Sequence, residues 1–248
     1  MSLGTVPSAR GPLETDFHVE PVFATPVVVW HVPEAERLND ALEKSILERR
    51  SQDPGVRRSN AGGWHSDTGF FQWGGDAAQK LAREVVSLAE ANTIDLRPSS
   101  ERHSGWALEG WANVNESGSS NHPHCHGGCY WSAVYYVRID GSGAELVLHD
   151  PRLPALDMYA PLLRFKHCGP EQELSIRPQA GLLILFPSWL VHSVLVFNGP
   201  GLRISVAINL SERIAALDPP FYSPGAGSFI SGTRMELRSS SWKAPDFA

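Results

Sequence analysis

The order of hydrophobic and polar residues divides the chain into a helical part and a longer part with the alternation of β-strands. Before about residue 104, hydrophobic residues recur every three or four positions in two segments, which predict helices at about residues 33–50 and 76–92. After that point the period becomes two, which is typical of strands with one buried face. Glycines and prolines separate the predicted strands. One strand is predicted before the helices, at residues 23–30. The others are residues 105–114, 130–138, 144–148, 173–177, 182–186, 191–197 and 202–210.

This order of elements predicts a mainly β protein, a jelly roll of two sheets with the N-terminal helices packed behind it. We expect a single domain over residues 21–217, with a β core at about residues 104–210. Residues 1–20 contain several glycines and prolines and are predicted to form a flexible arm. Residues 218–248 are rich in proline, glycine and serine, and are expected to form an extension or a lid.

Composition restricts the class of protein and its location. The net charge is −6, and acidic and basic residues are mixed along the chain, so a nucleic-acid-binding surface is not expected. No hydrophobic run approaches the roughly 20 residues of a membrane helix, and the first residues lack the hydrophobic core of a signal peptide. Three cysteines are few and odd in number, which favours a reducing compartment. We therefore expect a cytoplasmic protein with no nucleic-acid or membrane partner; its oligomeric state does not follow from the sequence.

The densest group of metal-binding side chains is the segment Asn-His-Pro-His-Cys-His-Gly-Gly-Cys at residues 121–129. It contains His122, His124 and His126, and imidazole is the commonest protein ligand of transition metals. Two histidines one residue apart on an extended segment point to the same side, because side chains alternate along a strand. Such a pair can bind one ion from one edge. At least one further ligand must then come from elsewhere in the chain.

A candidate for that ligand is His192, at the start of a predicted strand. In the next predicted strand, hydrophobic residues alternate with Arg203, Ser205, Ala207 and Asn209. If the two strands form a hairpin, His192 lies on the same face as Arg203 and Ser205. A guanidinium binds a carboxylate through two parallel hydrogen bonds, so this face would suit a dicarboxylate beside a metal. The alternative is that this face is the wet outer face of the sheet.

Three blocks of sequence carry a further signal: Gly-Trp-His-Ser at residues 63–66, the Asn-x-x-His-x-His block at 111–137, and the His…Arg-x-Ser block at 181–209. Together they resemble a bacterial and phage family of 2-oxoglutarate/Fe(II)-dependent oxygenases, over roughly residues 20–212. The resemblance implies a double-stranded β-helix, cupin-like, that holds Fe(II) in its mouth. It implies that His124 and His192 are iron ligands and that Arg203 with Ser205 binds the distal carboxylate of 2-oxoglutarate. Asn113 is a further candidate for lining this pocket.

One position departs from the broader superfamily, in which an acid stands two residues after the first histidine. Here that residue is His126, and three explanations stay open. In the first, His126 is itself a ligand, so that His124, His126 and His192 form a three-histidine site. In the second, His122 and His124 are the pair. In the third, an acid comes from elsewhere, such as Asp67. The spacing to the following strand favours His124 with His126.

The resemblance implies an enzyme, a dioxygenase of the hydroxylase type that uses Fe(II), 2-oxoglutarate and O2. We expect it to hydroxylate a small-molecule or amino-acid-type substrate and to release succinate and CO2. One alternative is a three-histidine cupin-type dioxygenase that does not use 2-oxoglutarate. The other is a non-catalytic jelly-roll binding module stabilised by a metal such as zinc. A structural zinc site would use Cys125 or Cys129, and His167 and Cys168 are the only candidates for a second pair of ligands. Aromatic candidates for the pocket walls are Trp111, Trp131, Tyr135, Tyr136 and Trp189.

Overall fold

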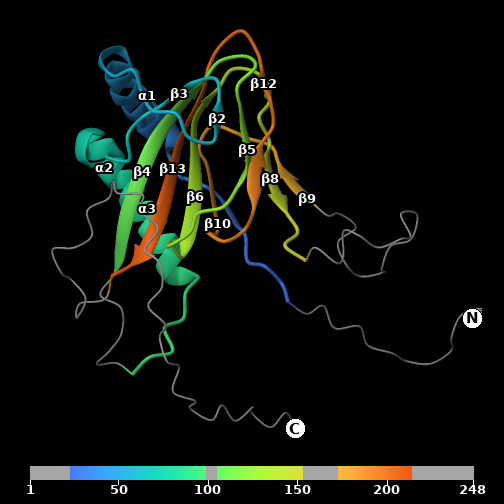
Figure 1. Ribbon diagram of the computed structural model, residues 1–248. Coiled ribbons are helices and arrows are strands. Elements are labelled where there is room, and N and C mark those ends of the chain that lie inside the picture. The colour runs from blue at the N-terminus through green and yellow to red at the C-terminus, as the bar shows by residue number, and fades with distance from the viewer. Residues whose placement is uncertain (1–22, 99–104, 153–172, 214–248) are drawn as a thin grey trace, which may run out of the picture.

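The computed structural model describes residues 23–98, 105–152 and 173–213 of the chain (Figure 1). The predicted N-terminal arm and the predicted C-terminal extension lie outside these residues, as do His167 and Cys168.

Two antiparallel sheets form the body of the protein. The larger sheet has six strands, in the order β1 (Val28–His31), β10 (Leu182–Pro187), β6 (Trp131–Ile139), β13 (Arg203–Glu212), β4 (Trp106–Asn115) and β3 (Trp64–His65). The smaller sheet has five, in the order β2 (Asn60–Ala61), β5 (Ser120–His124), β11 (His192–Val194), β8 (Leu146–His149) and β9 (Glu173–Ile176). A two-stranded ribbon joins β12 (Phe197–Asn198) to β7 (Ser142–Gly143). The predicted jelly roll, a double-stranded β-helix, is confirmed.

The helices lie against the larger sheet, on the side away from the smaller one (Figure 1). They are α1 (Ala35–Gln52), α2 (Phe70–Trp73) and α3 (Gly75–Ala91), and the two long ones lie within two residues of the predicted segments. The buried residues of α1 are Leu38, Leu42 and Ile46, the stripe that the spacing indicates. The short helix α2 has too few residues to show a period, and the sequence does not predict it.

The larger sheet therefore has two buried faces. On one face, the even-numbered side chains of β13, from Ile204 to Leu210, pack with α1 and α3 in a hydrophobic core. On the other face, Val134 and Tyr136 of β6 pack against Leu146 and Leu148 of β8, in a second core between the two sheets. The alternation that the sequence shows in β13 thus separates a helix-covered face from a face that looks toward the smaller sheet.

One predicted strand pairing is wrong. The strand expected at residues 191–197 does not form a hairpin with β13, because β11 pairs with β5 and β8 of the smaller sheet. The predicted strand is interrupted after Val194, and β12 then pairs with β7. The backbone hydrogen-bonding groups on both edges of β11 pair with strands that are distant in sequence, whereas those of β13 pair with β4 and β6. His192 and Arg203 consequently face each other across the two sheets instead of lying side by side.

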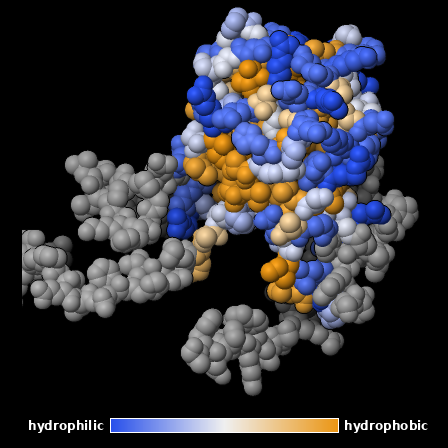
Figure 2. Space-filling view, turned by 180° about the vertical axis from the view of Figure 1, so that it is seen from behind, coloured by the Kyte–Doolittle hydropathy of each residue, from blue (hydrophilic) through white to orange (hydrophobic). Residues whose placement is uncertain are grey.

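The surface of the described part mixes polar and hydrophobic side chains, and Figure 2 shows an area where hydrophobic ones gather on the side opposite to Figure 1. Trp189, 52% exposed, is among the large hydrophobic residues at the surface. Among the helices of the described residues, none has the length and hydrophobicity that crossing a membrane requires.

Candidate metal centre and co-substrate pocket

Three histidine side chains converge between the ends of two paired strands. His124, the last residue of β5, lies opposite His192, the first residue of β11. His126 lies two residues beyond β5, and its backbone N–H donates a 2.9 Å hydrogen bond to the Ser188 carbonyl. The ring centres are 4.4–5.1 Å apart, and one nitrogen of each ring lies within 4.8 Å of the others. The geometry therefore suits one shared metal ion.

Backbone carbonyls fix the orientation of two of these rings. The Nδ1 of His124 is 2.7 Å from the His122 carbonyl oxygen, and the Nδ1 of His192 is 2.9 Å from the Leu190 carbonyl oxygen. A carbonyl only accepts a hydrogen bond, so Nδ1 carries the proton in both rings. The Nε2 lone pair is then free for a metal, the arrangement usual for ligating histidines.

Burial keeps the rings of His192 and His126 neutral. Burial lowers the pKa of His192 to about 3, and it lowers the pKa of His126 to about 4, with a further contribution from the neighbouring His124. Desolvation disfavours the charged imidazolium, and a nearby histidine adds repulsion. At pH 7 both rings are therefore unprotonated on one nitrogen, as metal binding requires.

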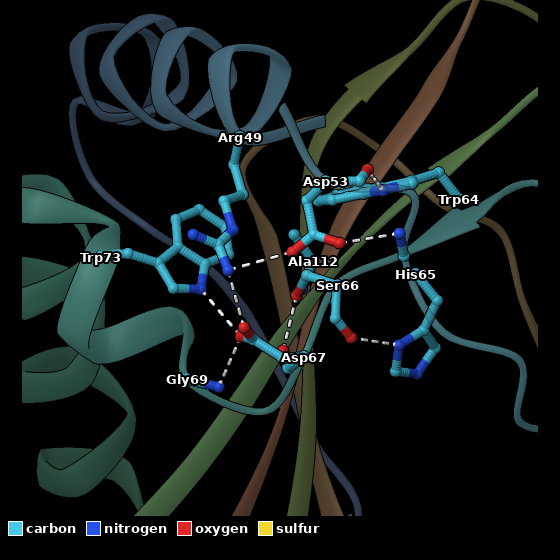
Figure 3. A network of polar contacts seen from close by, with 10 residues as sticks. Arg49, Asp53, Trp64, His65, Ser66, Asp67, Gly69, Trp73 and Ala112 are labelled. Carbon is cyan, nitrogen blue, oxygen red and sulfur yellow. Dashed lines mark hydrogen bonds and ion pairs between the residues drawn. The ribbon is translucent and has the colours of Figure 1, made fainter. Parts of the chain in front are cut away.

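The other residues considered for this site lie elsewhere. His122 is exposed and contributes its carbonyl, not its ring, to the contact with His124. The Asp67 carboxylate accepts hydrogen bonds from Arg49, the Trp73 indole and the Gly69 backbone, as Figure 3 shows. In the described part of the chain, neither carboxylate nor cysteine joins the cluster of the three histidines. His126, and neither His122 nor Asp67, therefore lies together with His124 and His192.

A cavity of about 520 Å³ opens beside the three histidines. One of its walls is β13, from which Arg203, Ser205, Ala207 and Asn209 face the cavity, as the alternation predicts. Arg203 is only 3% exposed and Ser205 only 1%, so the interpretation of this face as a wet outer surface is wrong. Asn113 of β4 lies opposite Ser205 and lines the same cavity.

Three polar atoms of this cavity are buried without a hydrogen-bond partner among the described residues: Arg203 Nε, Ser205 Oγ and the Tyr136 hydroxyl. The Arg203 guanidinium lies over the Tyr136 ring, 5.3 Å from its centre, and its Nη1 donates a 3.1 Å hydrogen bond to Asn115. Burial raises the pKa of Tyr136, so its hydroxyl stays protonated and can donate. Each such unpaired atom costs about 1–3 kcal/mol. A carboxylate, which only accepts, would pair with all three donors.

The aromatic residues expected as pocket walls divide between the two faces of the larger sheet. Trp111 and Tyr136 line the cavity. Trp131 and Tyr135 lie on the helix side, where the Trp131 indole donates to Thr93 and the Tyr135 hydroxyl donates to Asn39. Trp189 is largely exposed, so it is not a wall either. The strand period could have separated Tyr135 from Tyr136, since adjacent residues point to opposite faces.

Comparisons with known proteins agree with this geometry. Residues 109–209 match the model of the family described as Putative 2OG-Fe(II) oxygenase. Among solved structures, a Pseudomonas putida prolyl-4-hydroxylase is similar, with 18% identity over 76% of this chain and 94% of that chain and a TM-score of 0.54.

A Trichoplax adhaerens prolyl hydroxylase, solved with a hypoxia inducible factor peptide, has 14% identity over 75% and 83% of the two chains, with a TM-score of 0.53. HygX from Streptomyces hygroscopicus, solved with nickel and 2-oxoglutarate, has 14% identity over 80% and 85%, with a TM-score of 0.50. A search of curated proteins gives no match. At such identities the solved structures show the shared fold, and the match of residues 109–209 confirms the family resemblance.

Proposed function

Because residues 109–209 belong to the 2OG-Fe(II) oxygenase family, an enzyme family that uses Fe(II), 2-oxoglutarate and O2, we propose the following assignment of this site. His124, His126 and His192 bind Fe(II). Arg203, Ser205 and Asn113 bind 2-oxoglutarate. The enzyme hydroxylates a small-molecule or amino-acid-type substrate and releases succinate and CO2. The two similar prolyl hydroxylases support a substrate of the amino-acid type.

The observation that carries this proposal is the placement of two complementary sets of groups in one cavity. Histidine nitrogens with free lone pairs stand on one side, and buried donors without partners stand on the other. The first set fits a metal, and the second fits the far carboxylate of a dicarboxylic acid bound to that metal. When bound, Fe(II), 2-oxoglutarate and O2 supply the oxidation of a substrate C–H bond.

The residues of the chain position these groups and keep water away. The two backbone carbonyls that hold Nδ1 of His124 and His192 aim the two Nε2 atoms at one point. Arg203 fixes the distance of the distal carboxylate from that point, assisted by the hydroxyls of Ser205 and Tyr136. Apolar side chains, including Val134 and Ala207, also line the cavity.

A third histidine in place of a carboxylate leaves one more unit of positive charge at the metal. The doubly negative 2-oxoglutarate compensates for this charge. We therefore expect Fe(II) to bind more tightly in the presence of 2-oxoglutarate, and 2-oxoglutarate to bind more tightly in the presence of Fe(II), by the same factor.

The test is made without oxygen. Fe(II) and 2-oxoglutarate are added to the wild-type protein, and the weak visible charge-transfer band of the iron chelate is recorded. We expect the band in wild type and in His31→Ala, which alters an exposed histidine on β1, and we expect its loss in His124→Ala. Screening of amino acids and small peptides by succinate release follows.

Two outcomes contradict the proposal in different ways. Tight iron binding without the band would favour a three-histidine dioxygenase that does not use 2-oxoglutarate. Absence of iron binding in wild type would make the cluster a structural or zinc site, as expected of a non-catalytic binding module.

A further inference from the structure

His65 has no part in the assignment above, yet it lines the same cavity. It lies on β3, at the edge of the larger sheet, and is only 5% exposed. Its ring stacks on Trp111, with ring centres 5.5 Å apart and planes within 12°, and Trp111 in turn contacts His126 at 5.7 Å. His65 is therefore separated from a proposed iron ligand by a single indole ring.

The free nitrogen of His65 is a hydrogen-bond acceptor. Nδ1 is 2.6 Å from the Ser66 carbonyl oxygen, which only accepts, so the proton of the neutral ring is on Nδ1 and Nε2 has the lone pair. Burial lowers the pKa of His65, which favours this neutral form. Among the described residues Nε2 has no hydrogen-bond partner. A buried acceptor beside a cavity is suited to a donor on a bound molecule.

The segment that holds His65 is fixed by hydrogen bonds on both sides (Figure 3). The Trp64 indole donates to the Asp53 carbonyl at 2.8 Å. Ser66 exchanges two 3.0 Å bonds with Ala112 of β4, through its backbone N–H and through its hydroxyl oxygen. The next residue, Asp67, is held by Arg49 at 2.8 Å. The position of Nε2 is thus set before any ligand arrives, as expected of a binding residue.

A second acceptor lies on the other side of Trp111 along β4, because His65 pairs with Asn113, two residues after Trp111. Glu109 precedes Trp111 by two residues on β4, so both side chains point to the same face, and Glu109 also lines the cavity. Its carboxylate is half-buried and has no hydrogen bond or ion pair with the described residues. Arg58, which lines the cavity near His65, is exposed. The carboxylate of Asp67, by contrast, is paired with Arg49.

We propose that His65 Nε2 and the Glu109 carboxylate bind the primary substrate on either side of Trp111, and that this substrate is an amine. Its ammonium group pairs with Glu109, and an N–H or O–H group donates to His65. The proposal rests on the proposed function, because it takes the space between the three histidines and Arg203 as the place of iron and 2-oxoglutarate. It makes His65 and Glu109 specificity-determining residues.

The experiment uses four probes of nearly the same shape: cyclohexylamine, cyclohexanol, methoxycyclohexane and cyclohexanecarboxylate. Their affinities for the wild-type protein, saturated with Ni(II) and 2-oxoglutarate, are measured by calorimetry. We expect the affinity for the amine to be at least about tenfold higher than that for the carboxylate, which corresponds to one charge-assisted contact. The alcohol should bind more tightly than the ether, because only the alcohol can donate to His65.

Variants separate the two contacts. Glu109→Gln should remove the preference for the amine over the carboxylate. His65→Asn, whose amide reaches only as far as Nδ1, should remove the preference for the alcohol over the ether. His65→Gln, whose amide reaches the position of Nε2, should keep most of it. Glu48→Gln on α1 and His31→Gln on β1, both exposed and outside the cavity, should leave all four affinities unchanged.

The proposal is overturned if no probe binds, if the carboxylate binds as tightly as the amine, or if the ether binds as tightly as the alcohol. It is also overturned if Glu109→Gln and His65→Asn retain the wild-type preferences. The iron chelate band, recorded on the same proteins, separates this failure from that of the proposed function. If the wild-type protein shows the band but no preference among the probes, only the roles of His65 and Glu109 are wrong. If the band is missing, both proposals are wrong.

Discussion

Along β13, the two faces of the larger sheet are both largely buried but differ in chemistry. Along β13, the side chains toward the helices are hydrophobic, and Ile204, Val206, Ile208 and Leu210 are at most 1% exposed. The alternate side chains toward the cavity include Arg203, Ser205 and Asn209, which are 1–7% exposed. Burial alone therefore does not distinguish a core from a binding site in this protein.

The distinction lies in whether the polar atoms have partners. On the helix face, the Trp131 indole and the Tyr135 hydroxyl donate to residues of the helical layer. On the cavity face, three polar atoms lack partners among the described residues. The polar groups of Trp131 and Tyr135 are thus satisfied without a ligand, whereas the three atoms of the cavity face gain partners when a ligand supplies the acceptors. Substitutions on the two faces should accordingly affect different measurements.

The largest effect is expected on the cavity face, from His192→Ala. Loss of one of three proposed ligands should lower Fe(II) affinity at least about 100-fold, in line with a loss of roughly 3 kcal/mol or more. The rise in melting temperature that Fe(II) produces by binding the folded state should disappear with it. Anaerobic iron titration and thermal unfolding, with and without metal, measure both effects, and His31→Ala is the control. An unchanged iron affinity would remove His192 from the site.

On the helix face, Leu81→Ala should affect stability and leave the site intact. Leu81 of α3 is fully buried, and truncation of a buried leucine costs about 2–5 kcal/mol. Urea unfolding measures the loss, and the chelate band per folded molecule should keep its wild-type intensity. If the band weakens in molecules that are still folded, the two faces are coupled and the contrast between them is wrong.

Strand period allows the contents of each face to be predicted from sequence. Ser205 and Ile204 fall on opposite faces of β13 simply because they are adjacent, and the expected face of Arg203 is the observed one. The two long helices follow in the same way, because they carry a hydrophobic stripe over several turns.

Which strands are neighbours does not follow from local pattern. β11 is separated from β13 by a short segment, and yet it joins β5 and β8 in the other sheet. Such pairing depends on contacts that are distant in sequence. For the same reason the sequence does not show that His65, on a two-residue strand, reaches the cavity through its pairing with β4. Its place in the Gly-Trp-His-Ser block is the only signal that could have suggested a role.

A smaller effect is expected from Arg203, whose loss should weaken 2-oxoglutarate without removing iron. Arg203→Ala deletes charge-assisted hydrogen bonds worth about 1.5–3 kcal/mol, which is roughly a 10- to 150-fold loss of 2-oxoglutarate affinity. Arg203→Lys keeps the charge but cannot donate two parallel hydrogen bonds, so its 2-oxoglutarate affinity should lie between those of Arg203→Ala and wild type. Titration of the chelate band gives the co-substrate affinity, and iron titration is the control. An equal loss of iron and 2-oxoglutarate binding would mean that Arg203 is structural.

The smallest effect, and the sharpest comparison, comes from two adjacent tyrosines on opposite faces of β6. Tyr135→Phe removes a hydroxyl that donates to Asn39 at 2.7 Å, so it should lower stability by about 0.5–1.5 kcal/mol and leave 2-oxoglutarate affinity unchanged. Tyr136→Phe removes a buried hydroxyl without a partner, so the ligand-free protein should become more stable by roughly 1 kcal/mol.

In the same Tyr136→Phe variant, 2-oxoglutarate affinity should fall by a few-fold, because the carboxylate loses one neutral donor worth about 0.5–1.5 kcal/mol. Urea unfolding without ligand and titration of the chelate band measure the two quantities. Opposite signs of the stability change in the two variants would show that the protein holds an unpaired hydroxyl for its co-substrate. A loss of stability in both variants would mean that Tyr136, like Tyr135, already has a partner in the ligand-free state.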